Sequence, residues 1–107
     1  MPLINVEYDN VVVSEEKIKS LSEAICEIVS RTTEIKDVFV YANSSQIKVQ
    51  VAPIEIFVRM TAAKIKDEAV LMNKIKEELK DWKTKNNFEY PVNLTLIPMN
   101  WKVQIGI

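Results

Sequence analysis

The sequence of 107 residues contains no histidine, one cysteine and one glycine. Without histidine the chain cannot build a Ser-His-Asp or Cys-His nucleophile system, an imidazole metal ligand or an imidazole pH switch. The lone Cys26 cannot form an internal disulfide or a thiolate cluster for zinc or iron–sulfur. The single Gly106 excludes a dinucleotide-binding fingerprint and a P-loop, which need glycines where the backbone approaches phosphate. We therefore expect no metal and no cofactor.

The chain also lacks an excess of charge of either sign, with 14 Lys+Arg against 15 Asp+Glu and a formal net charge of −1. A nucleic-acid-binding domain would show a strongly basic balance or a basic stripe. The lysines of residues 74–85 alternate with acidic residues, a pattern typical of the solvated face of a helix. The first residues resemble no secretory signal, and no apolar run is long enough to span a membrane. We expect a cytoplasmic protein that binds neither nucleic acid nor membrane.

Hydrophobic residues make up 48% of the sequence, enough for one compact domain over residues 1–107. A chain this short leaves much of its surface exposed unless copies associate, because the buried fraction rises with size. Self-association is therefore expected from the length alone.

Strand-like segments with apolar alternation or continuous apolar character occur four times. Residues 2–8 form the first predicted strand, with a proline at its start, where a missing N–H costs least. Residues 37–41 are β-branched and aromatic, and we expect them to form a largely buried second strand. Residues 53–59 form the third strand. Residues 92–97 form the fourth, and Pro98 is expected to close it.

Two amphipathic helices lie between these strands. Ser14 is expected to cap the first, which ends near residues 32–33, and Thr61 is expected to cap the second, which ends at residues 86–87. The apolar positions of the first helix are Ile18, Leu21, Ile25, Ile28 and Val29, and those of the second are Ile65, Ala69, Met72, Ile75, Leu79 and Trp82.

The element order is β-α-β twice over, and we interpret it as pseudo-repeats of about residues 1–52 and 53–107, each opening on a proline. A long helical crossover favours parallel pairing of the two strands it joins. The predicted fold is therefore α+β, a four-stranded sheet with both helices on one face and the other face covered by self-association. Residues 46–51 are a short extension or an arm, and residues 101–107 a short alternating tail.

The Met-Pro start, followed by two β-α-β units in this length, resembles the tautomerase superfamily, which includes 4-oxalocrotonate tautomerase and macrophage migration inhibitory factor. Residues 53–59 (PIEIFVR) and 92–99 (VNLTLIPM) are similar to a small bacterial branch of uncharacterised domains in that superfamily. The resemblance implies a homotrimer in which removal of Met1 leaves Pro2 as the N-terminus. Its secondary amine would then be the general base of a keto–enol tautomerase acting on a small keto acid.

The resemblance also indicates where a substrate carboxylate would be held. In well-studied tautomerases one cation lies just ahead of the first helix and another on or near the second strand, but the matching positions here carry Val13 and Phe39. Lys36 and Arg59 are the candidate replacements, since either could bind a carboxylate and arginine does so in a bidentate way. The alternative for both is a solvated charge at a strand end.

Three aromatic residues, Tyr8, Tyr41 and Trp101, are candidates to line an apolar pocket near this site, although strand aromatics more often belong to a core or interface. Proline in second position is also common in proteins without any such chemistry. Two further hypotheses therefore stand beside the tautomerase. One is a non-catalytic oligomeric scaffold or interaction protein of the same fold, and the other a ferredoxin-like regulatory domain that binds a small ligand.

Overall fold

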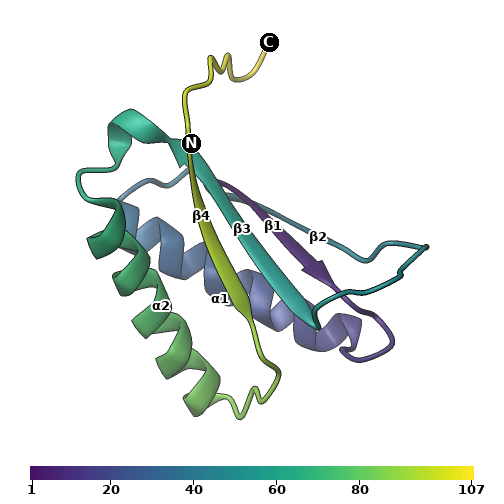
Figure 1. Cartoon of the computed structure of the whole chain (residues 1–107). Coiled ribbons are helices and arrows are strands. Elements are labelled where there is room, and N and C mark those ends of the chain that lie inside the picture. The colour runs from purple at the N-terminus through teal and green to yellow at the C-terminus, as the bar shows by residue number, and fades with distance from the viewer.

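The computed structural model describes residues 1–107 as four strands and two long helices (Figure 1). The elements are β1 (Leu3–Tyr8), α1 (Glu15–Thr33), β2 (Phe39–Asn43), β3 (Ile54–Thr61), the short 3-10 helix η1 (Ala62–Lys64), α2 (Glu68–Lys85) and β4 (Asn93–Met99). Neither long helix has the length and apolar character needed to cross a membrane.

The strands form one sheet in the order β2-β1-β3-β4. β1 pairs with β2 and β3 pairs with β4 in parallel, and the central strands β1 and β3 are antiparallel. Both helices cover the same face of the sheet (Figure 1), so the predicted α+β architecture is confirmed. The ferredoxin-like hypothesis, in which strands pair antiparallel throughout, is wrong because each β-α-β unit has parallel strands.

The two faces of the sheet carry alternate residues of each strand. Strand pairs match odd-numbered residues with odd-numbered ones, for example Leu3 with Phe39 and with Arg59. The even-numbered residues of β1 and β3 up to Met60 face the helices, and Ile4, Ile56 and their neighbours are buried there. We call the side with the odd-numbered residues the open face. The core between sheet and helices consists of Ile4, Val6, Val13, Ile18, Leu21, Ile25, Ile28, Val29, Ile54, Ile56, Val58, Ile75, Leu79 and Phe88.

The start of α1 agrees with the prediction, because the Ser14 hydroxyl accepts the N–H of Lys17 at 3.3 Å. The start of α2 does not. Thr61 is the last residue of β3, and η1 separates it from α2, which begins after Asp67. The Asp67 carboxylate accepts the N–H of Val70 at 3.1 Å and so caps the helix. The prediction was wrong because the residues after Thr61 form η1 and then the extended Ile65, and the Thr61 hydroxyl makes no cap hydrogen bond.

Two other boundaries also differ. β4 continues through Pro98, which lies opposite Met60, to Met99, because an edge strand tolerates a residue without an N–H. Residues 46–51 form no strand and belong to the loop between β2 and β3. The Lys48 ammonium fastens this loop to the end of β1, at 3.1 Å from the Asp9 carboxylate.

β2 is less buried than its composition predicts. It begins at Phe39, and its aromatic side chains Phe39 and Tyr41 are 41% and 55% exposed. The prediction of a largely buried strand was wrong for a single chain, because β2 lies at the sheet edge and these two residues point to the open face.

Candidate functional site

The candidate site lies at the end of the sheet where β1 begins, which we call the Pro2 end. β2 runs parallel to β1, and β3 and β4 run antiparallel to it, so the starts of β1 and β2 meet the ends of β3 and β4 there. Pro2, Lys36 and Arg59 therefore come to one end of the sheet although they are far apart in sequence. In Figure 1 the N-terminus is at the same end of the sheet as the ends of β3 and β4.

Pro2 is held firmly at the beginning of β1. Its side chain is fully buried, and its carbonyl accepts the N–H of Phe39 at 3.2 Å. The alternation of β1 places the Pro2 ring on the helix side, with Ile4 and Val6. Met1 precedes it, so the Pro2 nitrogen is an amide in the full chain and becomes an amine only when Met1 is removed.

Arg59 lies on the open face, and its guanidinium makes only one hydrogen bond within the chain. Its Nη1 donates to Asn5 Oδ1 at 2.6 Å, and the guanidinium carbon lies 5.6 Å from the centroid of the Phe57 ring. No carboxylate pairs with it in the chain, so most of its five donors are unused. The site therefore contains an arginine able to bind an anion.

The chain's other arginine, Arg31, is fully engaged elsewhere. It bridges Glu27 of α1 and Glu78 of α2 through its guanidinium. The hydrogen bond to Glu78 is the main cause that raises the pKa of Arg31 above its ordinary value. Arg31 thus ties the helices together and has no part in the candidate site.

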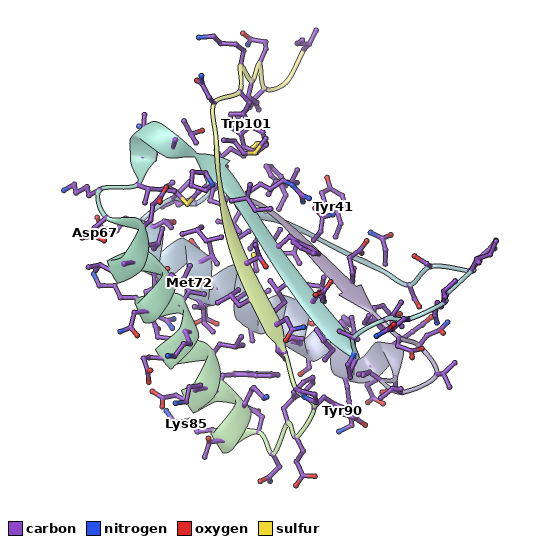
Figure 2. The ribbon with its side chains drawn as sticks, in the orientation of Figure 1. Tyr41, Asp67, Met72, Lys85, Tyr90 and Trp101 are labelled. Atoms are coloured by element: carbon purple, nitrogen blue, oxygen red, sulfur yellow. The ribbon has the colours of Figure 1, made fainter.

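Tyr41 shares the open face with Arg59. It lies opposite Asn5 across the β1–β2 pair, and Asn5 in turn lies opposite Phe57. Asn5 therefore lies between Tyr41 on β2 and Phe57 on β3. Figure 2 shows Tyr41 beside β1 and β2. Sequence reasoning missed Asn5 and Phe57. Their only signal is the odd-numbered strand position that they share with Arg59.

The other predicted residues lie apart from this group. Tyr8 is at the opposite end of β1, where it faces Ile54 and packs against the core. Lys36 is exposed just before β2, and its side chain lines a hollow beside α1 rather than the open face. Val13 is buried in the core, whereas Phe39 stands on the open face.

Pro2 and Arg59 occupy the same end of the sheet but not the same face. The Pro2 ring faces the helices, and Arg59 lies opposite Leu3 on the open face. Neither Pro2 nor Arg59 lines any of the five main surface hollows of the chain. A single chain therefore brings a buried proline and an arginine without an acidic partner to one end of the sheet without enclosing a common pocket.

Trp101 also stands at the Pro2 end. Its indole Nε1 donates to the Thr61 hydroxyl at 2.9 Å, which fixes the point where the chain leaves β4 (Figure 2). This is a structural anchor beside the candidate site, and the tail beyond it forms no helix or strand.

No protein-family model and no curated protein matches the sequence. Solved structures do match its fold. A malonate semialdehyde decarboxylase superposes with a TM-score of 0.71 at 13% identity, covering 98% of this chain and 92% of that chain. A fused 4-OT asymmetric trimer has a TM-score of 0.69 at 13% identity, with 97% and 92% covered.

A domain of unknown function from Sebaldella termitidis has a TM-score of 0.64 at 16% identity, covering 100% of this chain and 98% of that chain. The chain has the tautomerase/MIF-like fold. The predicted resemblance is thereby confirmed at the level of the fold.

Proposed function

We propose that this chain is a keto–enol tautomerase whose general base is the secondary amine of Pro2, exposed by removal of Met1. The amine takes the proton from the enol oxygen of a small keto acid and the resulting ammonium returns a proton to the adjacent carbon, so that the keto form results and the base is regenerated. The observation that carries the proposal is a buried proline opening the first strand of a tautomerase fold.

The surroundings of Pro2 suit a base at neutral pH. A free α-amino group titrates at a pKa of about 7.7–8.0, and an apolar environment disfavours its cationic form and lowers that pKa further. Ile4 and Val6 follow Pro2 on the same face of β1, and both are fully buried. An amine in this setting would be largely unprotonated near pH 7, as a general base must be.

Arg59 is proposed to hold the carboxylate of the keto acid. Its guanidinium already donates to Asn5 but has no acidic partner, so it can accept a bidentate carboxylate without breaking an ion pair. Tyr41, on the same face, would line the apolar side of the pocket. Lys36 and Tyr8 are proposed only as more distant contributors, since their side chains lie apart from this group.

The active unit is proposed to be a homotrimer in which a neighbouring copy closes the pocket between Pro2 and Arg59. Two features support this. The open face carries the half-exposed Phe39 and Tyr41, which a second copy would cover. A fused 4-OT trimer is among the structures of the same fold. The non-catalytic scaffold remains the second hypothesis, because Val13 and Phe39 stand where better-known tautomerases carry cations.

The test begins with the intact mass of untagged protein, which reports whether Met1 is removed, followed by assays on phenylenolpyruvate and 2-hydroxymuconate. Pro2→Ala, which replaces the secondary ring amine at the N-terminus by a primary amine on a more mobile residue, is expected to lower kcat/KM by about 100-fold or more, because the proposed base is the ring amine. The matched control is Pro53→Ala, which changes the proline just before the third strand, where the nitrogen is an amide and cannot act as a base. It should keep full activity.

Either of two outcomes would contradict the proposal. One is a retained Met1 with no turnover of either substrate, which would favour the scaffold hypothesis. The other is equal loss of activity in Pro2→Ala and Pro53→Ala, which would indicate that both changes act through the fold.

A further inference from the structure

The strand residues on the open face form three rows in the register of the sheet. The row nearest Pro2 contains Phe39, Leu3, Arg59 and Ile97, the middle row Tyr41, Asn5, Phe57 and Thr95, and the far row Asn43, Glu7, Glu55 and Asn93. Arg59 is the only cation in these rows, and Glu7 and Glu55 are the only carboxylates. A ligand that lies along the open face therefore meets one cation at the Pro2 end and two carboxylates at the far end.

Asn5 is oriented by Arg59. A guanidinium only donates hydrogen bonds, so the amide oxygen of Asn5, and not its nitrogen, must face Arg59 Nη1, which lies 2.6 Å away. The amide nitrogen Nδ2 makes no hydrogen bond within the chain, although the side chain is partly buried. One amide donor is therefore held beside the unused donors of the guanidinium.

Arg59 and Asn5 together match the hydrogen-bonding capacity of one carboxylate. A bidentate pair with a guanidinium uses two of the roughly four lone-pair sites of a carboxylate, and Asn5 Nδ2 can donate to one of the others. The bond to Asn5 and the Phe57 ring, 5.6 Å from the guanidinium carbon, restrict Arg59 before a ligand arrives. This restriction lowers the side-chain entropy that is lost on binding.

We propose that Arg59 and Asn5 form one subsite for a single carboxylate and that the acidic far row excludes a second one. Asn5 both positions Arg59 and donates to the ligand. The ligand class is a monocarboxylate with a flat apolar body, which the rings of Tyr41 and Phe57 in the middle row can contact. The inference rests on the proposed function only in taking this ligand as the substrate, because binding to these residues needs no proton transfer at Pro2.

The two carboxylates of the far row have no cation to compensate them. Glu7 lies directly opposite Glu55 across the β1–β3 pair, and neither forms a salt bridge. The one side-chain hydrogen bond to this pair comes from Asn93 Nδ2, 3.4 Å from Glu55. Successive rows are two residues apart, which is about 7 Å. A six-carbon dicarboxylate that is held at Arg59 and runs along the face places its second charge in the middle row, within the screening length of about 8 Å from the far row, and is repelled.

The direct test is calorimetric binding of 3-phenylpropanoate and of adipate to the untagged protein. Neither compound has a keto group, so binding is measured without turnover. The wild type is expected to bind 3-phenylpropanoate at least about tenfold more tightly than adipate, whose second charge finds no partner. In the Glu7→Gln, Glu55→Gln double variant the affinity for adipate should rise about fivefold, while that for 3-phenylpropanoate stays within about twofold, because only a second carboxylate meets the far row.

The role of Asn5 is tested by Asn5→Asp, which keeps the side-chain volume and places a carboxylate against Arg59. The Kd of 3-phenylpropanoate should rise about tenfold or more, since the new carboxylate competes with the ligand for the guanidinium. Asn5→Ala, which removes the amide without adding a charge, should raise the Kd about threefold. The matched control is Asn93→Asp, the same change in the far row, which should alter the Kd by less than about twofold.

Three results would overturn the proposal. They are no binding of 3-phenylpropanoate by the wild type, equal losses of affinity in Asn5→Asp and Asn93→Asp, and an unchanged preference between the two ligands in the Glu7→Gln, Glu55→Gln variant. A purely structural role of Asn5 would lower the Tm without this difference in Kd between the two asparagines, so thermal unfolding is recorded for each variant. Absence of turnover in a protein with the expected binding pattern would support the subsite and contradict the proposed tautomerase alone.

Discussion

The two faces of the sheet differ more than the two halves of the chain do. The helix-covered face is wholly apolar in the central strands, and Ile4, Ile54, Ile56 and Val58 are fully buried there. The open face mixes a guanidinium, an amide and half-exposed aromatic rings. The helix-covered face therefore supplies most of the folding stability, whereas the polar groups available for binding lie on the open face. Pro2 lies at the end of the sheet, with its ring on the helix-covered side.

The sharpest test of this division compares one residue from each face. Ile56→Ala on the helix side is expected to lower the free energy of unfolding by about 3–5 kcal/mol, because it leaves a cavity in a closed core. Tyr41→Ala on the open face should cost less than about 1 kcal/mol in dilute, monomeric protein, since its side chain is already 55% exposed. Urea denaturation at low concentration measures both. Equal losses would break the comparison.

A second test concerns binding on the open face. Arg59→Ala is expected to raise KM for a keto acid by about 10-fold or more, as loss of a charged hydrogen bond does. Arg59→Lys should recover only part of this effect because lysine lacks the planar fork. The control is Lys36→Ala at the same end of the sheet, which removes a charge from outside the open face and should change KM little. A larger rise in KM for Lys36→Ala than for Arg59→Ala would indicate that the substrate carboxylate binds beside α1 and not on the open face.

The smallest effect is expected at the far end of the sheet, where Asp9 fastens the β2–β3 loop. Hydrogen bonds from the Val11 N–H and from Lys48 lower the pKa of Asp9 below its ordinary value of 3.8. A depressed native pKa contributes stability above the unfolded value, and that contribution is lost as the pH falls through the native one. The stability difference between the wild type and Asp9→Asn should therefore shrink as the pH falls below 3.8.

Thermal unfolding over an acid pH series measures this difference. Asp37→Asn, which removes a carboxylate with no hydrogen bond or ion pair in the structure, is the control. A difference between the wild type and Asp9→Asn that stays constant through the acid range would show that ionisation of Asp9, with its contacts to Val11 and Lys48, adds nothing to stability.

Most of the fold could be predicted from local patterns. Alternation in residues 54–60 marks a strand with one buried face, and Ser14 marks a helix start, because both signals arise from neighbouring residues. The start of α2 could not be predicted in the same way. Thr61 and Asp67 are both chemically able to cap a helix, and the short turn η1 with the extended Ile65, which separates the first from α2, leaves no comparable mark in the sequence.

The candidate site was less predictable than the fold. Arg59 was recognised as an unusual residue, but its bond to Asn5 depends on a register between strands 54 positions apart. The exposure of Phe39 could not be predicted either, since an apolar strand looks the same in sequence whether a core or another copy covers it. The hydrophobic periodicity of one chain does not show whether a strand face is covered by that chain or by another copy.

The pairing of β1 with β3 also determines the order in which the sheet can form during synthesis. β1 joins β3 through partners as far apart as Leu3 and Arg59, so the middle of the sheet cannot close until the ribosome has released more than half the chain. Until then β1 can pair only with β2, and the inner edge of β1 is exposed while synthesis continues. Long-range closure of this kind slows folding relative to helical proteins of equal length. The nascent first half is therefore the stage of its synthesis at which this protein most needs protection from unwanted strand pairing.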